Sequence, residues 1–164
     1  MASSIELPAI VETQDETYAF IHSVLPRAEM HAKLPSILQE LHGALTAQGL
    51  PIQPWFAHYL SLSQGACEFE SCLPVDSSFM PRGRVVQGIW PAGTVARTVY
   101  QGDYLGLPAA WAEFGRWIVE GGHVSASHIY ERYVVNRHRT QNPTELRTEL
   151  SWPLIRSTAK QEQA

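Results

Sequence analysis

Hydrophobic and polar residues alternate most regularly near the end of the chain, in residues 144–154, TELRTELSWPL. Leu146 and Leu150 occupy alternate positions, and the charged residues Arg147 and Glu149 lie between them. This period of two predicts a strand with one buried face and one charged face. A solvated outer face is the ordinary explanation for a glutamate in such a strand.

Two earlier segments have the longer period of an amphipathic helix. Residues 34–41, LPSILQEL, and residues 107–114, LPAAWAEF, share the pattern LPxxxxE and are interpreted as two copies of one helix. Pro35 and Pro108 suit the first helical turn, where a backbone N–H has no partner to lose. The glycines expected to end these helices are Gly49, Gly121 and Gly122.

The strands repeat as well. Residues 68–75, EFESCLPV, align with residues 147–154, and residues 55–62 match residues 129–136 in their aromatic character. Each half is therefore predicted to contain a strand, a helix and a hairpin. Residues 11–26 are expected to form an opening strand pair, or a strand and a turn. The whole pattern predicts an α+β fold with an antiparallel sheet covered by helices on one face.

The repeat also predicts the domain organisation. Residues 1–158 are expected to form a single domain with pseudo-repeat halves of about 10–80 and 84–156, followed by a flexible tail at 159–164. A central ligand cleft is expected between the halves, because such junctions commonly hold ligands.

Composition narrows the choice of partners. The chain has 164 residues, a hydrophobic fraction of 45% and a net charge of -4, which is a globular composition without an electrostatic reason to bind nucleic acid directly. The one basic cluster, Arg137, His138 and Arg139, is interpreted as a solvated loop. No segment reaches the roughly 18 apolar residues of a membrane helix, and the N-terminus does not look like a signal peptide. We therefore expect a cytoplasmic protein that does not bind membranes.

Metal and cofactor chemistry has little support in the sequence. Cys67 and Cys72 are the only cysteines, and the seven histidines lack the spacing of metal ligands. No glycine-rich phosphate loop follows a predicted strand. We expect neither a metal site nor a cofactor.

Glu131 and Glu149 form the candidate catalytic pair. If the loop of residues 136–144 is symmetric, these glutamates face each other on neighbouring strands, with Cβ atoms ~5 Å apart. Burial would raise the pKa of one carboxyl group and let it act as an acid or base near neutral pH. The alternative is a pair of exposed charges partnered by Arg132 or Arg147.

The order of these motifs resembles a known family. Residues 100–122, YQGDYLGLPAAWAEFGRWIVEGG, the closing strand TELRTELSWPL, and WFAHYLSL followed by EFESCLPV occur in an order similar to that of the GyrI-like small-molecule-binding domains. The resemblance covers about residues 5–156. It implies a duplicated α+β fold with a central cleft, found alone or attached to the DNA-binding domains of AraC-type and MerR-type regulators.

The resemblance also implies a range of functions. Regulator members bind drug-like, often cationic aromatic compounds between aromatic walls, with a cleft glutamate that Glu149 matches. Stand-alone members inhibit DNA gyrase or protect against its poisons. A further group hydrolyses the cyclopropane of DNA-alkylating natural products with two cleft glutamates, which Glu131 and Glu149 match. Trp111 and Tyr133 match aromatic positions that line the cleft.

We therefore expect a stand-alone protein that binds hydrophobic, planar or cationic drug-like molecules and hydrolyses cyclopropane-bearing alkylators. Aromatic walls would stack on such ligands, although several of the tryptophans fit the protein core equally well. The alternatives are sequestration without catalysis and interaction with DNA gyrase. The residues expected to contact a ligand are Trp111, Tyr133, Tyr104, Trp90, Trp55, Tyr59 and Arg147.

Overall fold

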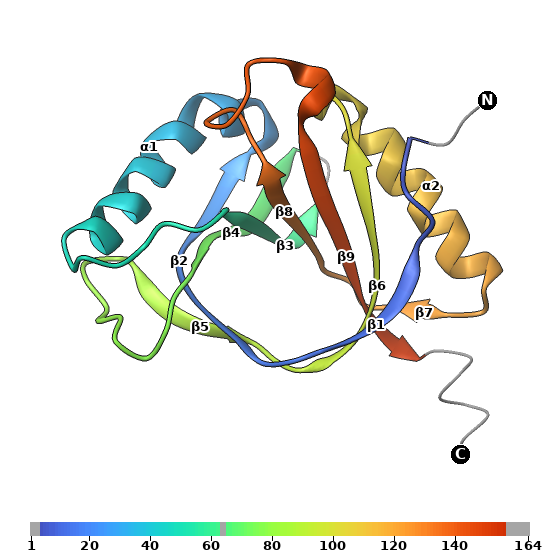
Figure 1. Cartoon of the computed structure of the whole chain (residues 1–164), viewed down its shortest axis with the longest axis horizontal. Helices are drawn as coiled ribbons and strands as arrows, with labels where there is room; N and C mark the ends of the chain where they lie inside the picture. The colour runs from blue at the N-terminus through green and yellow to red at the C-terminus, as the bar shows by residue number, and fades with distance from the viewer. Residues whose placement is uncertain (1–3, 63–64, 157–164) are drawn as a thin grey trace. The chain divides into compact units, whose positions relative to one another are not determined.

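The alternating segments pair into antiparallel sheets in the computed structural model, which describes residues 4–62 and 65–156 (Figure 1). The chain divides into two compact units. The α1 unit runs from Gln14 to Ala92, and the α2 unit joins the residues up to Thr13 to those from Gly93 onward.

In the α1 unit, helix α1 (Arg27–Thr46) packs on a sheet with the strand order β3-β4-β2-β5. Its strands are β2 (Glu16–Pro26), β3 (Phe56–Leu62), β4 (Ala66–Pro74) and β5 (Val86–Trp90). Ile21 and Phe69 of the sheet pack with Leu41 and Leu45 of the helix, and all four side chains are buried. This face of the sheet therefore holds the core of the unit.

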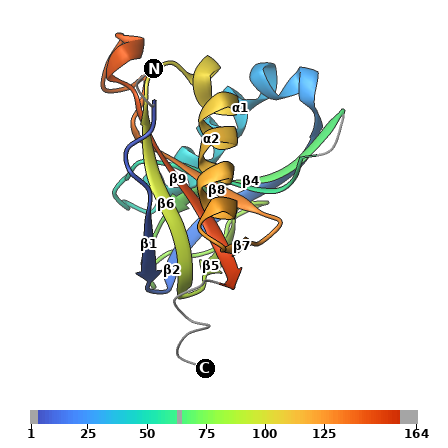
Figure 2. The same cartoon turned by 90° about the vertical axis from the view of Figure 1, so that its right-hand side faces the viewer.

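In the α2 unit, helix α2 (Leu107–Glu120) lies against one face of a sheet with the order β1-β6-β9-β8 (Figures 1 and 2). The strands are β1 (Ala9–Thr13), β6 (Gly93–Gln101), β8 (Ile129–Val135) and β9 (Arg147–Arg156), and the short β7 (Val124–Ser125) pairs with β9. Phe114 and Ile118 of the helix pack on Ala96 and Leu150 of the sheet. Short 3-10 turns, η1 (Tyr104–Gly106) and η2 (Pro143–Glu145), precede α2 and β9.

Both units follow the predicted plan of strand, helix and hairpin, so the α+β class with antiparallel sheets and helices is confirmed. The predicted opening strand pair is wrong. β1 pairs with β6, and β2 pairs with β4 and β5, so β2 has a neighbour on each side. The predicted tail at 159–164 lies outside the described residues, and the cleft between the halves stays a prediction.

The helix ends agree with the repeat in one unit more closely than in the other. Pro108 lies in the first turn of α2, as predicted, whereas Pro35 lies inside α1. The reason is the segment before Pro35, RAEMHAKL, which is rich in good helix formers and begins the helix at Arg27. Gly49 and Gly122 adopt the left-handed conformation, with φ of 71° and 79°.

The described helices give no indication of a membrane-spanning segment. In residues 4–62 and 65–156, no helix combines the length and the apolar character needed to cross a bilayer.

The contrast between the two prolines can be tested by replacing each with alanine. Pro35 lacks the N–H that an interior helical residue donates, and its ring crowds the preceding turn. We expect Pro35→Ala to raise the free energy of unfolding by about 1 kcal/mol, because it restores a hydrogen bond. Pro108→Ala is the matched control and should change it much less, since a first-turn residue has no such bond. Urea unfolding followed by circular dichroism would check this, and equal effects of both substitutions would contradict it.

Candidate functional site

Glu131 is a buried carboxylate beneath helix α2. It lies on β8 opposite Leu150 of β9, so its side chain points to the face of the sheet that packs on the helix. Only 6% of its surface is exposed. The indole Nε1 of Trp111 donates a hydrogen bond of 2.7 Å to Oε1, and the hydroxyl of Tyr133 donates one of 2.5 Å to Oε2. Each carboxylate oxygen therefore accepts one hydrogen bond.

The sequence positions these donors by simple periodicity. Glu131 and Tyr133 are two residues apart on one strand, so they share a face. Trp111 comes from the first half of α2, whose apolar stripe packs on that same face. Tyr104 lies in η1, just before α2, and its ring meets the ring of Tyr133 edge to face at 5.7 Å. One carboxylate and three aromatic side chains are thus brought together inside the α2 unit.

Glu131 forms no ion pair within the part of the chain that the structure describes. Burial raises the pKa of its carboxyl group, and the hydrogen bonds from Tyr133 and Trp111 oppose this rise only in part. Across residues 4–62 and 65–156, no lysine, arginine or histidine forms an ion pair with it. The site is therefore a negative or neutralisable group in an aromatic, largely desolvated environment.

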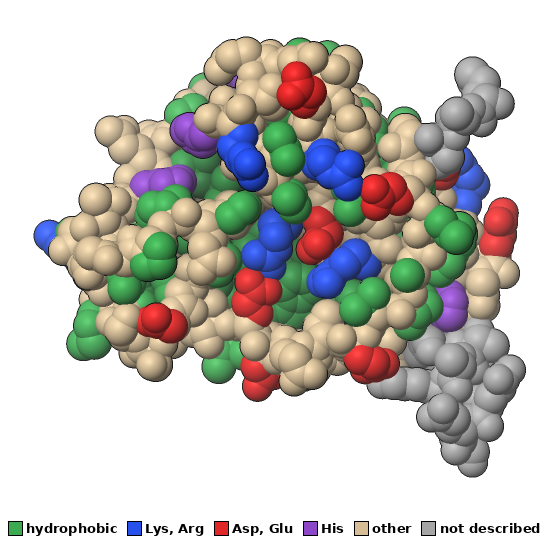
Figure 3. Space-filling view, in the orientation of Figure 1, with side chains coloured by type: hydrophobic (Ala, Val, Ile, Leu, Met, Phe, Trp, Pro, Cys, Tyr) green, Lys and Arg blue, Asp and Glu red, His purple; other side chains and the backbone are tan. Residues whose placement is uncertain are grey.

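The predicted pairing of Glu131 with Glu149 is wrong. Glu149 lies opposite Arg132, one position out of the predicted register, and points to the other face of the sheet. Its Oε1 atom lies 3.5 Å from Nε of Arg97 and 3.7 Å from Nε of Arg132. Figure 3 shows basic and acidic side chains next to one another over β9 and its neighbours. Glu149 is thus a half-buried, ion-paired carboxylate, with 24% of its side chain exposed. The alternative was right about Arg132 as a partner and wrong about an exposed charge.

Two irregularities in the hairpin change the register. The turn η2 extends the loop, so Val135 meets Arg147 instead of Glu145. A bulge between Tyr133 and Val135 then leaves one residue of β8 without a partner in the ladder. Beyond the bulge, from Tyr133 toward the start of β8, each residue therefore pairs one position out of step with β9. The resulting register sets Arg132 opposite Glu149 and avoids two like charges in opposition, which agrees with the preference for unlike cross-strand pairs.

The remaining predicted ligand contacts lie elsewhere. Arg147 bonds Glu6 at 2.9 Å and Gln101 at 3.1 Å on the surface of the α2 unit. Trp90 is buried in the α1 unit beside Phe56, with ring centroids 6.2 Å apart. Trp55 and Tyr59 pack against the core under α1. Within the α2 unit, only Trp111, Tyr133 and Tyr104 of the predicted aromatic residues therefore gather around Glu131.

The α1 unit carries a polar cluster that the sequence reasoning missed. Glu70 accepts hydrogen bonds from the Tyr18 hydroxyl at 3.0 Å, and it lies 2.9 Å from Nδ1 of His58. The alignment of Glu70 with Glu149 contained the signal, because both glutamates lie opposite a basic residue of the neighbouring strand, His58 or Arg132. The repeated feature is a cross-strand pair of a glutamate and a basic residue on the face away from the helix of each unit.

Arg137 is an exposed loop residue, as interpreted from the sequence, but its contact with Tyr104 was missed. Its guanidinium carbon lies 5.9 Å from the centroid of the Tyr104 ring, and its Nη2 lies 3.9 Å from Oδ2 of Asp103. No periodic pattern in the loop could have indicated this contact, since it joins residues far apart in the sequence.

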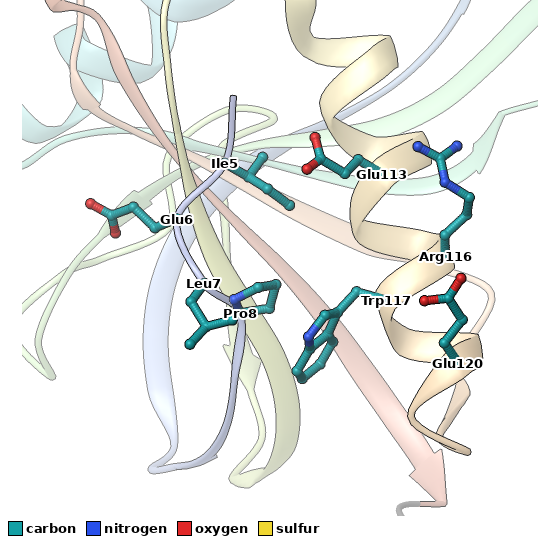
Figure 4. A pocket seen from close by; sticks show the side chains of 8 residues that line it. All are labelled: Ile5, Glu6, Leu7, Pro8, Glu113, Arg116, Trp117 and Glu120. Atoms are coloured by element: carbon teal, nitrogen blue, oxygen red, sulfur yellow. The ribbon is translucent and has the colours of Figure 1, made fainter. Parts of the chain in front are cut away.

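A separate groove of about 420 Å³ lies between the N-terminal segment and the outer side of α2 (Figure 4). The ring of Trp117 borders it opposite Pro8 and Leu7, whereas Arg116 and Glu120 lie further around the helix. None of the predicted site residues lines this groove. It is therefore distinct from the surroundings of Glu131.

Metal ligation has no support in the described part of the chain. Residues 4–62 and 65–156 contain no group of three or more histidine, cysteine or acidic side chains placed to hold an ion. Cys67 and Cys72 are free and buried.

Comparison with known proteins agrees with this architecture. Residues 7–155 match the model of the GyrI-like small molecule binding domain. No curated protein matches the chain in sequence. Among solved structures, the C-terminal domain of EcmrR is 22% identical, with a TM-score of 0.78 over 92% of this chain and 98% of that domain. In the EcmrR-DNA complex the match has the same TM-score, and this chain spans 57% of that longer protein.

Two further structures share the fold at lower identity. A hydrolase from Listeria innocua is 11% identical, with a TM-score of 0.71 over 90% of this chain and 91% of that one. SAV2435, solved with bound tetraphenylphosphonium, is 10% identical, with a TM-score of 0.64 over 91% of this chain and 94% of that one. At these identities the likeness shows the fold alone.

The burial of Glu131 predicts a pH-dependent cost. A carboxyl group whose pKa is raised by folding stabilises the protein fully below its unfolded pKa of about 4.3, and this contribution is lost as the pH rises through the folded pKa. Glu131→Gln removes the charge and keeps an oxygen that can accept a bond. We expect its urea midpoint to exceed that of the wild type at pH 7, with the difference shrinking toward pH 4.

The matched control for this measurement is Glu149→Gln, which removes a carboxylate that has positive partners. Its urea midpoint should show no gain at pH 7. A Glu131→Gln variant that is less stable than the wild type at pH 7 would contradict the description of Glu131 as an uncompensated buried charge.

Proposed function

Because the chain belongs to the GyrI-like family of small-molecule-binding domains, we propose that it binds lipophilic organic cations through the carboxylate of Glu131. The observation that carries this proposal is the isolation of that carboxylate. It is buried and accepts hydrogen bonds from Trp111 and Tyr133, and no cation among the described residues pairs with it. A positively charged ligand would form the ion pair that the described residues do not provide.

The energetics favour a cation with a weak hydration shell. Moving a carboxylate out of water costs several kcal/mol, and attraction to an opposite charge at 4 Å returns about 4 kcal/mol at an effective dielectric constant of 20. A metal ion would also need several further oxygen or nitrogen ligands. A large organic cation needs no such ligands and loses little hydration on entering an apolar site.

The aromatic side chains favour the same class of ligand. Trp111, Tyr133 and Tyr104 present ring faces and edges around the carboxylate. A cation over such a ring gains about 0.5–2 kcal/mol, depending on its desolvation. Ring substituents on the ligand would gain further from edge and face contacts. Monovalent cations that carry aromatic groups are therefore the proposed ligands.

Trp111 controls access to the carboxylate. Its Nε1 occupies the bonding position at Oε1, and its ring rests edge to face on Trp152 at 5.6 Å. A ligand that contacts Oε1 directly must replace this hydrogen bond. Trp111 fluorescence is therefore the proposed reporter of binding.

The proposal predicts a charge-selective titration. Tetraphenylphosphonium, the ligand present in the SAV2435 structure, and tetraphenylborate have nearly the same shape and opposite charges. In calorimetry we expect the wild type to prefer the cation, and Glu131→Gln to lose about tenfold or more of its affinity for it, which is about 1.4 kcal/mol. Glu149→Gln, whose side chain lies on the other face, should bind the cation as the wild type does. Equal cation affinity in the wild type and Glu131→Gln would refute the proposal.

Hydrolysis of cyclopropane-bearing alkylators is the finer function that the family resemblance implies. A mechanism with Glu131 and Glu149 as acid and base needs both carboxylates beside one substrate, whereas their side chains point to opposite faces of the sheet. The pKa of Glu131 is set by burial and by two neutral donors, with no second carboxylate contributing. The arrangement therefore favours binding over turnover by this glutamate pair.

Incubation with a cyclopropane-bearing alkylator tests this choice. We expect tryptophan quenching without ring-opened product, measured by chromatography and mass spectrometry. Product formation that disappears in both Glu131→Gln and Glu149→Gln would reinstate the two-glutamate mechanism.

A further inference from the structure

Arg137 is a positive charge at the outer end of the aromatic residues around Glu131. It lies in the loop that joins β8 to β9, at one end of the sheet of the α2 unit (Figure 1). Its guanidinium carbon stands 5.9 Å from the centroid of the Tyr104 ring. The ring of Tyr104 in turn contacts the ring of Tyr133, whose hydroxyl donates a hydrogen bond to the carboxylate of Glu131. A continuous path of contacts therefore runs from a surface arginine to a buried glutamate.

The surrounding residues hold Arg137 in this place. Asn136 accepts a hydrogen bond from the backbone N–H of His138 at 2.9 Å and donates one to the Tyr133 carbonyl at 3.2 Å, which orders the start of the loop. Asp103 caps η1 through Oδ1, which accepts from the backbone N–H of Leu105 at 2.9 Å. Its other oxygen, Oδ2, faces Arg137 at 3.9 Å.

Tyr104 experiences both charges. Burial raises the pKa of its hydroxyl, the positive charge of Arg137 lowers it, and the negative charges of Glu131 and Asp103 raise it. Arg137 and Glu131 therefore shift the pKa of the same hydroxyl group in opposite directions. The attachment of Arg137 is weak, however, because 51% of its side chain is exposed and its ion pair with Asp103 is long.

We propose that Arg137 is an internal competitor of the ligand, whose guanidinium occupies the cation position on Tyr104 until a bound organic cation displaces it. This proposal rests on the proposed function of the Glu131 site and adds a determinant of its selectivity. A guanidinium over a tyrosine ring at an exposed site is worth about 0.5–1 kcal/mol, which corresponds to a factor of about 2–5 in affinity. The interaction of a ligand with this site must therefore be stronger than the contact between Arg137 and Tyr104. The loop between β8 and β9 moves when a ligand displaces Arg137.

The test compares two arginines of one loop. Arg137→Gln and Arg139→Gln change the net charge equally. Within the described residues, the exposed Arg139 has only a backbone hydrogen bond, from its N–H to the Asn136 carbonyl. In calorimetry with tetraphenylphosphonium at 50 mM NaCl, we expect Arg137→Gln to bind about 2–5 times more tightly than the wild type. For Arg139→Gln, the fold-change in affinity should be less than half of that expected for Arg137→Gln. In Arg137→Lys, which keeps the charge and loses the planar stacking group, the gain should be intermediate.

Each other outcome overturns the proposal. Equal gains from Arg137→Gln and Arg139→Gln would show a general effect of net charge, and a loss of affinity in Arg137→Gln would make Arg137 part of the binding surface. Glu131→Gln in the same titration separates the two levels of argument. If it binds as the wild type does, the proposed function fails whatever Arg137 does. If it loses affinity while Arg137→Gln equals the wild type, only the competition fails.

Discussion

A buried carboxylate that pairs with no cation in the described part of the chain is the constraint on which this site depends. Such a group is expensive to keep ionised, and it persists only where donors compensate part of the cost. For Glu131 the donors are the Trp111 indole and the Tyr133 hydroxyl, which occupy both oxygens. Trp111 comes from α2 and Tyr133 from β8. The packing of the helix on the sheet therefore also positions the donors that stabilise the charged carboxylate. A cation that binds here would stabilise a carboxylate that folding has already removed from water.

The alternation of strand residues separates structural charges from this one. In the α2 unit, on the face of the sheet away from α2, Glu149 lies near Arg97 and Arg132. In the α1 unit, Glu70 lies beside His58. These carboxylates have basic neighbours and reinforce strand pairing. On the helix face, Glu131 forms no ion pair with a basic side chain of the described residues. A shift of one residue in register decides which glutamate takes which role, and the bulge near Val135 sets that shift.

Periodicity predicted the parts of the fold that depend on repeated burial. The stripes of α1 and α2 and the hairpin of β8 and β9 follow from which residues share a face. Trp111 and Tyr133 were expected near a ligand from the family resemblance and not from periodicity. The partner of Glu149 did not follow, because a 3-10 turn and a bulge in one hairpin leave no period to detect. The contact between Arg137 and Tyr104 was hidden for a similar reason, since it joins a loop to the start of a helix. Pro35 misled because its local preference for a first turn was outweighed by the helix formers before it.

The central claim is that the charged form of the Glu131 carboxyl group attracts a cationic ligand. A pH titration of the Glu131 side-chain carboxyl carbon by NMR, in the free protein and with saturating tetraphenylphosphonium, tests this most directly. The account predicts a titration midpoint above that of exposed glutamates in the free protein. Ligand should move the midpoint to lower pH, because a neighbouring cation stabilises the charged form. A midpoint that stays in place when the cation binds would contradict the account.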